Sequence, residues 1–273
     1  MAEIGRMSIN QATTREQHSL AEAIAAYAAH GVTGISIWRD KLAECGLDRA
    51  VSLIGEHGLR VSGLCRAGQF PAADAAERQA RIDDNLLAVE QAVALGADCL
   101  VIVAGGLPEG SRDLPGARSM IRDALGAVLP RARAAGVPLA IEPLHPMYAA
   151  DRCAINTLSQ ALDLCDELGE GIGVAVDAYH VWWDPDLATQ IARARGRILA
   201  FHVCDWLVPT TDLLLDRGMM GDGVIDLPAM RAAVEAAGYA GLIEVEIFSA
   251  ANWWRRPGDE VIRTCRERFQ QAV

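Results

Sequence analysis

Four side chains that can bind a metal ion stand at the ends of short apolar runs. Residues 137–141 precede Glu142, residues 173–176 precede Asp177, residues 199–201 precede His202 and residues 242–245 precede Glu246. A carboxylate at the mouth of a buried strand is costly unless a cation or another charged partner meets it. Three carboxylates and one imidazole suit a hard to borderline ion with open positions, whereas zinc favours more histidine or cysteine. We therefore predict a divalent-metal site, with Mn²⁺ as the expected ion and Mg²⁺ or Co²⁺ as alternatives.

The chemistry open to such a site is proton abstraction next to a carbonyl group. A divalent ion that binds the carbonyl and a neighbouring hydroxyl of a keto-sugar acts as a Lewis acid and stabilises the enediolate. The base must stand within about 3 Å of the proton. In an isomerase or epimerase, Glu142 and Glu246 would face each other, one removing the proton and the other returning it. In an eliminating enzyme His145 would be the base, because a neutral imidazole near pH 7 suits that task.

Glu244 competes with Glu246 for the fourth ligand position. The two residues are two apart, so on a strand they share a face. We assign Glu246 to the metal because it is nearer the strand end, and Glu244 to a buried acceptor or a partner for an arginine.

Tryptophan is concentrated after the predicted strand ends, where all six occur. Aromatic faces stack on sugars or flat aglycones, and an exposed tryptophan is costly. We predict that Trp38, Trp182 and Trp206 bind substrate. Packing beneath loops or at a subunit interface is the alternative.

The elements that must position these residues alternate between strand and helix. The predicted strands are 6–9, 34–38, 60–64, 99–103, 137–141, 172–176, 198–203 and 242–246. The predicted helices are 19–30, 48–57, 74–95, 117–135, 157–168, 184–195, 228–237 and 258–271. Eight such units predict a (β/α)8 TIM barrel, an α/β fold in which the active site lies at the carboxyl ends of the strands. With no break in composition, residues 1–273 form a single domain. A doubly wound sheet is disfavoured because no glycine-rich turn follows the first strand.

The amino-acid composition argues against several kinds of binding partner and cellular location. The formal net charge of −11, with Lys41 as the single lysine, argues against nucleic acid and anionic lipid. No apolar run reaches the roughly 20 residues of a membrane span, and no signal peptide is evident. Seven cysteines without a C-x-x-C pair indicate a reduced, cytoplasmic protein.

The motifs around these residues resemble the xylose-isomerase-like TIM barrels, the sugar isomerase and epimerase superfamily. They are Ile141-Glu142-Pro143-Leu144, Asp177-Ala178-Tyr179-His180, Phe201-His202-Val203, Gly221-Asp222-Gly223-Val224-Ile225-Asp226 and Glu244-Val245-Glu246-Ile247-Phe248. The resemblance implies one divalent ion, usually manganese, held by Glu142, Asp177, His202 and Glu246, and a substrate-binding role for His180. Relatives often carry an arginine shortly after the strand-seven histidine, and this chain has Cys204-Asp205-Trp206 there, so recognition of the substrate hydroxyls must differ.

A narrower resemblance concerns residues 143–148, 180–185 and 203–206. These runs are similar to the barrel subunit of bacterial C-glycoside deglycosidases, which cleave a C–C bond in 3-oxo glycosides beside a smaller β-sandwich subunit. It implies a lyase with His145 as base, and an inosose-dehydratase-like lyase is a further alternative. The expected partners are a small sugar or glycoside and an oligomer, with a non-identical subunit as one arrangement.

Two other classes of protein fit the sequence less well. A zinc endonuclease for abasic sites would need more histidine ligands and a basic groove, and a metal-free scaffold would not need four ligands. The absence of a cluster of lysine and arginine near the strand ends disfavours a phosphorylated substrate, although four arginines remain available for one: Arg152, Arg217, Arg255 and Arg256.

Overall fold

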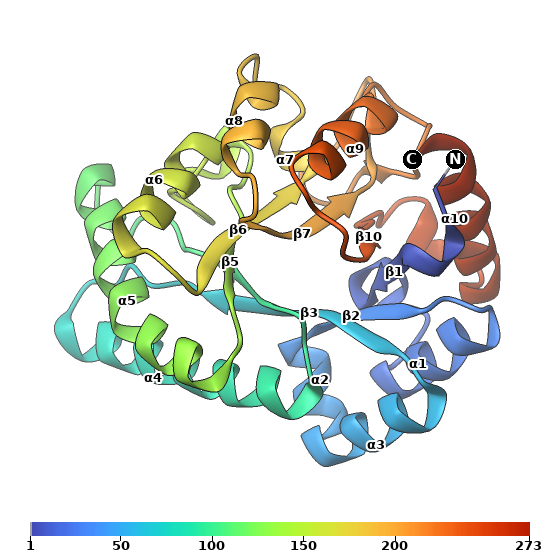
Figure 1. The fold of residues 1–273 in the computed structure, drawn as a ribbon, viewed down its shortest axis with the longest axis horizontal. Helices are drawn as coiled ribbons and strands as arrows, with labels where there is room; N and C mark the ends of the chain where they lie inside the picture. The colour runs from blue at the N-terminus through green and yellow to red at the C-terminus, as the bar shows by residue number, and fades with distance from the viewer. Residues whose placement is uncertain (1) are drawn as a thin grey trace.

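Eight parallel strands close into a barrel in the computed structural model, which describes residues 2–273 (Figure 1). The strands are β1 (Met7–Asn10), β2 (Gly34–Trp38), β3 (Arg60–Gly68), β4 (Leu100–Val103), β5 (Leu139–Ile141), β6 (Ile172–Asp177), β7 (Ile198–Val203) and β10 (Ile243–Val245). Their order around the barrel follows the chain, and β10 pairs with β1 to close it. The predicted (β/α)8 TIM barrel is confirmed.

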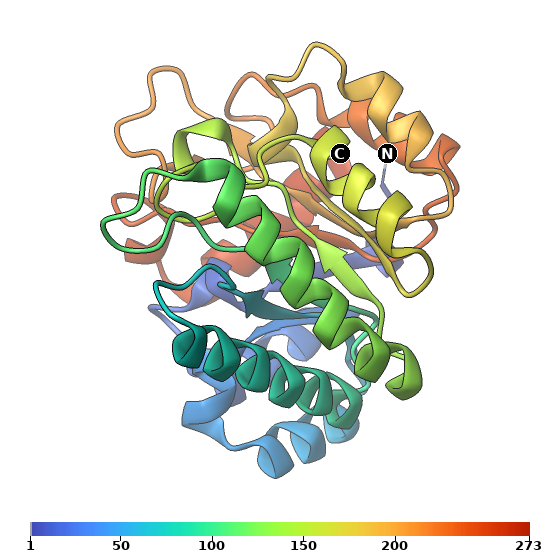
Figure 2. The same ribbon diagram turned by 90° about the vertical axis from the view of Figure 1, so that its left-hand side faces the viewer.

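Helices connect successive strands and cover the barrel from outside; Figure 2 shows α4 and α5 side by side. The main helices are α1 (Leu20–Ala29), α3 (Leu47–His57), α4 (Ala75–Leu95), α5 (Leu114–Ala135), α6 (Leu158–Leu168), α8 (Leu187–Arg193), α9 (Leu227–Ala236) and α10 (Gly258–Ala272). Side-chain oxygens cap several of them: Ser19 and Glu22 form a capping box at α1, and Asp226 accepts a hydrogen bond from the Ala229 N–H at α9.

Two short α-helices and two short strands were not predicted from the sequence. They are the helices α2 (Arg39–Cys45) and α7 (Ala178–Val181), and the antiparallel pair β8 (Asp205–Trp206) and β9 (Arg217–Gly218). Asp205 holds this pair and the following loop, because its carboxylate accepts hydrogen bonds from the N–H groups of Trp206, Gly221 and Ile225. The sequence therefore missed local structure that lies beyond the strand ends.

Strand β3 is longer than the predicted 60–64 and continues to Gly68. Asn85 of α4 fixes this extension by accepting a hydrogen bond from the Gly68 N–H (2.6 Å) and donating one to its carbonyl (2.8 Å). Gly68 has φ +104°, and a Cβ there would lie 2.1 Å from the carbonyl oxygen of Val103, so only glycine fits. The extension carries Arg66 to the rim of the barrel.

The interior of the barrel is filled by small and sulfur-bearing side chains. One cluster contains Cys65, Cys99, Val101, Ala140, Ala175 and Ala200. The three alanines leave the space into which a larger side chain from β10 can project. All seven cysteines are free thiols, and burial raises the pKa of Cys99, which fits the predicted role of small core residues.

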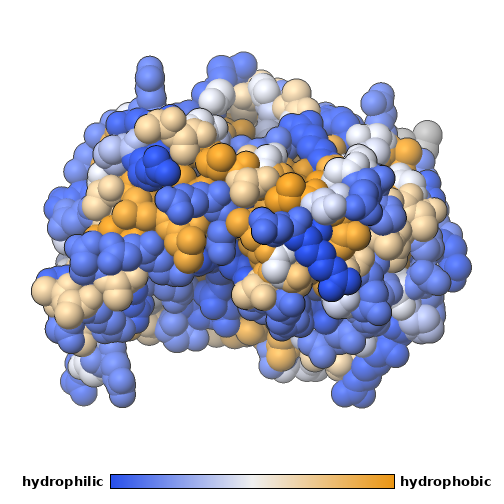
Figure 3. All heavy atoms as spheres, turned by 90° about the horizontal axis from the view of Figure 1, so that it is seen from below, coloured by the Kyte–Doolittle hydropathy of each residue, from blue (hydrophilic) through white to orange (hydrophobic). Residues whose placement is uncertain are grey.

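The outer surface is mostly hydrophilic, with apolar side chains gathered in places, as Figure 3 shows from the side of α3 and α4. Exposed apolar residues on these helices are Val51, Leu87 and Val93. Within residues 2–273, no helix combines the length and apolar character needed to cross a membrane.

Candidate metal centre

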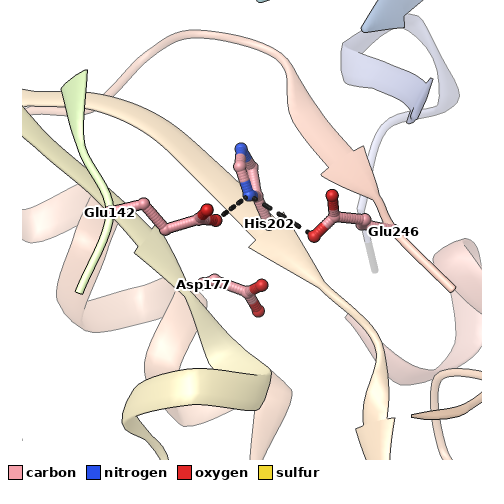
Figure 4. Close-up of side chains that lie close together, drawn as sticks. All are labelled: Glu142, Asp177, His202 and Glu246. Atoms are coloured by element: carbon pink, nitrogen blue, oxygen red, sulfur yellow. Dashed lines mark hydrogen bonds and ion pairs between the residues drawn. The ribbon is translucent and has the colours of Figure 1, made fainter. Parts of the chain in front are cut away.

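Glu142, Asp177, His202 and Glu246 converge at the carboxyl ends of β5, β6, β7 and β10 (Figure 4). One ligand atom from each lies within 4.8 Å of the others, and all four residues are buried. Ligand oxygens and nitrogens on opposite sides of a divalent ion are about 4–5 Å apart, so one ion can contact all four. The parallel strands end at the same rim, which is why residues up to 104 positions apart meet there.

The imidazole of His202 lies between the two glutamates. Its Nδ1 atom is 2.9 Å from Oε1 of Glu142 and 3.9 Å from Oε2 of Glu246. Its Nε2 atom is buried, has no hydrogen-bond partner within residues 2–273, and lies 3.6 Å from Oε1 of Glu244. If Nδ1 binds a metal ion, the ring proton must be on Nε2. The carboxylate of Glu244 is the acceptor that this N–H group faces.

Glu244 projects into the barrel behind Glu246. Its two oxygens accept hydrogen bonds from Asn10 (2.7 Å) and Ser62 (2.9 Å). The same Asn10 amide also donates to Oε1 of Glu246 at 2.9 Å. Asn10 on β1 therefore fixes both carboxylates, Ser62 on β3 also fixes that of Glu244, and Glu244 occupies the buried acceptor position considered for it.

Arg217 is the functional side chain that sequence analysis missed as part of this cluster. Its Nη1 atom donates to Oδ2 of Asp177 (3.1 Å) and to Oε2 of Glu246 (3.0 Å), and its Nη2 atom lies 3.1 Å from Nε2 of His180. The guanidinium also faces the rings of Tyr179 and Phe248. It stands on β9, fifteen positions after His202, and no motif in that loop marks it.

The cluster has more negative than positive charge. Burial alone would raise the pKa of Asp177, but Arg217 and the nearby histidines lower it to about 2. Burial, together with repulsion from Glu142 and Asp177, raises the pKa of Glu246 to about 8. The same guanidinium contacts this carboxylate and lowers its pKa, but not enough to offset these two effects. The carboxylates also raise the pKa of His202 against the effect of burial, yet this imidazole and one arginine cannot compensate four buried carboxylates, which include Glu244.

These observations fit a divalent cation. The donor set of three carboxylates and one imidazole and the excess negative charge meet the demands of such an ion, and Nε2 of His202, beside Glu244, can carry the ring proton. The fold and the cluster thus define a TIM barrel with a buried metal-binding centre at its carboxyl rim.

A small cavity adjoins the cluster at Glu142 and Glu246, with a volume of about 30 Å³, enough for a few water molecules. Trp38, Glu142, His180, Arg217 and Glu246 are among its lining residues. Burial lowers the pKa of His180 to about 3 against the opposing effect of Asp177, so the ring is neutral. Trp38 and His180 thus lie where a ligand of the centre would contact them.

His145, Trp182 and Trp206 lie in an aromatic cluster beside the cavity and do not line it. The ring of His145 stacks on Trp206, with centroids 5.1 Å apart, and meets Trp183 edge-on at 5.7 Å. Trp206 also packs against Trp182 at 5.6 Å. Substrate binding by Trp182 and Trp206, and catalysis by His145, stay predictions that need a substrate reaching beyond the present cavity.

The loop before β9 forms part of the cavity wall. Two tyrosine hydroxyls, from Tyr148 and Tyr179, donate to the carbonyl oxygen of Leu213. The next residue, Leu214, lines the cavity. The two hydrogen bonds therefore hold an apolar side chain against the cavity beside the metal centre.

The chain belongs to the Xylose isomerase-like TIM barrel family, whose model matches residues 24–269. It is 26% identical to the inosose isomerase of Bacillus velezensis, over 98% of this chain and 97% of that protein. It is 30% identical to the L-ribulose 3-epimerase of Mesorhizobium japonicum over 46% of this chain and 39% of that protein. The expected kinship with sugar isomerases and epimerases is confirmed at this level.

Solved structures show the same fold. A crystal structure from Sinorhizobium meliloti 1021 has a TM-score of 0.98 at 61% identity, covering 99% of both chains. The IOLI protein, solved with a bound zinc atom, has a TM-score of 0.86 at 24% identity, covering 98% of both chains. The D-allulose 3-epimerase of a Methylomonas species, solved with D-allulose, has a TM-score of 0.78 at 20% identity and covers 98% of this chain and 97% of that one.

Proposed function

We propose that this chain is a divalent-metal-dependent enzyme that enolises a keto-sugar or keto-polyol, with isomerisation or epimerisation as the outcome. The observation that carries the proposal is the placement of Glu142 and Glu246, whose carboxylates line one cavity from opposite sides of His202 (Figure 4). A bound ion would supply Lewis acidity toward the substrate carbonyl. Glu142, Asp177, His202 and Glu246 would hold that ion, for which Mn²⁺ is our first choice.

The two glutamates would share the proton transfer. One carboxylate would remove the proton next to the carbonyl and the other would return a proton, to the opposite face in an epimerase. Asn10 and Arg217 both donate to Glu246 and so fix its orientation. Arg217 and His180 line the same cavity and would hold hydroxyl oxygens of the substrate.

Incorporation of solvent deuterium tests this proposal. The Mn²⁺-loaded protein, incubated in D₂O with an inosose or a ketohexose, should introduce deuterium next to the carbonyl, as followed by NMR. The inosose comes first because of the full-length similarity to inosose isomerase. Glu246→Gln should slow exchange by roughly 10²–10⁴-fold, whereas Glu109→Gln, on the exposed surface, should not. Metal-loaded protein that exchanges no proton of any keto-sugar would contradict enolisation.

A second candidate is a lyase, either a C-glycoside deglycosidase or an inosose-dehydratase-like enzyme. The observation that favours it is the environment of His145, which lies among Trp183 and Trp206. Burial there lowers the pKa of His145, so the imidazole is neutral at pH 7 and available as a base. An apolar, aromatic surrounding would also suit a flat leaving group.

The setting of the enzyme is part of the proposal. We expect a cytoplasmic protein that acts on a small sugar or glycoside and associates into oligomers, with itself or with a smaller second subunit. The exposed apolar residues Val51, Leu87 and Val93 are available for such contacts. Light scattering on the purified protein, and co-purification from its natural source, would distinguish these arrangements.

A further inference from the structure

A second depression adjoins the cavity on its outer side, with a volume of about 440 Å³. The two spaces are neighbours, because five residues line both of them: Trp38, Arg66, Arg152, Leu214 and Phe248. Four of the residues that line the outer depression are arginines: Arg15, Arg39, Arg66 and Arg152. This concentration of positive charge stands out in a chain whose formal net charge is −11.

Two of these arginines are compensated by carboxylates. Arg15 donates to Asp40 at 2.9 Å, and Asp40 itself lines the depression. Arg39 forms two hydrogen bonds with Asp84, of 2.7 and 2.8 Å. Their charges are therefore already met within the protein.

Arg66 and Arg152 are different, since neither has a carboxylate within 4 Å among residues 2–273. Arg152 is half-buried against the ring of Tyr148, 5.6 Å from its centroid, and its Nε atom has no hydrogen-bond partner in the same part of the chain. Burial lowers the pKa of Arg152, and the positive charges of Arg66 and Arg217 lower it further, against the opposing effects of Tyr148 and of Asp151, which lies beyond ion-pair distance. Arginines that approach one another with no counter-ion are typical of a site that receives an anion.

We propose that Arg66 and Arg152 bind an anionic group of the substrate, a carboxylate or a phosphate. This inference rests on the proposed function and narrows it to acidic keto-sugars. Both arginines line the inner cavity together with Glu142 and Glu246, so one small molecule can present its carbonyl end to the metal centre and its anionic end to them. The expectation that no arginine cluster lies near the strand ends is therefore revised, because β3 extends to bring Arg66 there.

Calorimetric binding to the Mn²⁺-loaded protein tests the anion site without requiring turnover. The probes are D-fructose, D-fructuronate and D-fructose 6-phosphate, which separate the neutral sugar, the carboxylate and the phosphate. At least one anionic sugar should bind about tenfold or more tightly than D-fructose, as expected of charge-assisted hydrogen bonds. Arg66→Gln and Arg152→Gln should each remove most of this preference and leave the affinity for D-fructose within about twofold.

Arg15→Gln is the matched control, because Arg15 lines the same depression but is paired with Asp40. It should keep the preference. Arg152→Lys, which retains a cation beside Tyr148, should fold like the wild type and keep part of the preference. The proposed anion site is wrong if the wild type binds all three sugars equally. It is also wrong if the Gln variants lower the affinity for D-fructose as much as the affinity for the anionic sugars. If the anionic sugars bind more tightly but no proton next to the carbonyl exchanges, the anion site would stand and only the proposed enolisation would be wrong.

Discussion

The Nε2 atom of His202 lies 3.6 Å from Oε1 of Glu244, on the far side of the ring from the nitrogen that faces Glu142. This placement lets Glu244 orient the imidazole and keep its proton away from the metal-binding nitrogen. We expect Glu244→Gln to weaken Mn²⁺ binding by about 10–100-fold, the range known for residues that orient metal ligands. Titration against a fluorescent chelator would measure it. Unchanged affinity would show that Glu244 only fills the barrel; the exposed Glu109→Gln serves as the control.

Metal addition should stabilise the folded chain, because a cation relieves repulsion among the buried carboxylates. At 100 times the dissociation constant, a ligand that binds only the folded state adds about 2.7 kcal/mol. In a domain of this size that corresponds to a rise in melting temperature of about 5–10 °C. Thermal unfolding after chelator treatment, with and without Mn²⁺, would test this. The double variant E142Q/E246Q should show no such rise in melting temperature. If no divalent ion raises the melting temperature of the wild type, the metal site is wrong.

Arg217 should be needed for stability most when no metal is bound. Removing one partner of a buried ion pair costs about 3–5 kcal/mol, and Arg217→Met leaves both Asp177 and Glu246 without this guanidinium. We expect a large loss of stability in urea for the metal-free variant, partly restored by saturating Mn²⁺. Arg231→Met breaks a part-exposed pair with Glu235 and should cost much less. If Arg217→Met loses the same stability with and without Mn²⁺, the contribution of Arg217 to stability does not depend on the metal centre.

His145 distinguishes the two enzyme classes. If the glutamates transfer the proton, His145→Ala should leave turnover of a keto-sugar within about threefold of the wild type. If His145 is the base of a lyase, the variant should lose turnover. The wild-type rate would then fall only at a pH below 6.5, because burial lowers the pKa and the neutral, active imidazole persists to lower pH. A pH profile of kcat/KM for both proteins would decide between them.

The sequence predicted the barrel and the meeting of four candidate metal ligands at one rim, because the information is local. Each apolar run ends in its ligand, and parallel strands bring those ends to one rim. Arg217 and Arg66 escaped prediction for another reason: their positions depend on β9 and on the extension of β3, which are fixed by distant partners such as Asn85. A lone arginine in a loop carries no periodicity from which its direction could be read.

Tryptophan shows the same limit. Six tryptophans after strand ends indicated a sugar-binding rim, yet Trp38 reaches the cavity while Trp182 and Trp206 pack beside it. Spacing tells which residues are near the rim, but the side-chain direction is set by loops such as the one held by Asp205. Residue type and strand position therefore predicted the metal centre better than they predicted its surroundings.

The carbonyl of Leu213, anchored by two tyrosine hydroxyls, fixes the loop whose next residue, Leu214, lines the cavity. A sugar is larger than the cavity that Leu214 lines, so we expect a substrate that contacts both Glu142 and Glu246 to break and remake this anchorage. Turnover would then be paced by a loop motion rather than by bond-making, and it would slow as solvent viscosity increases.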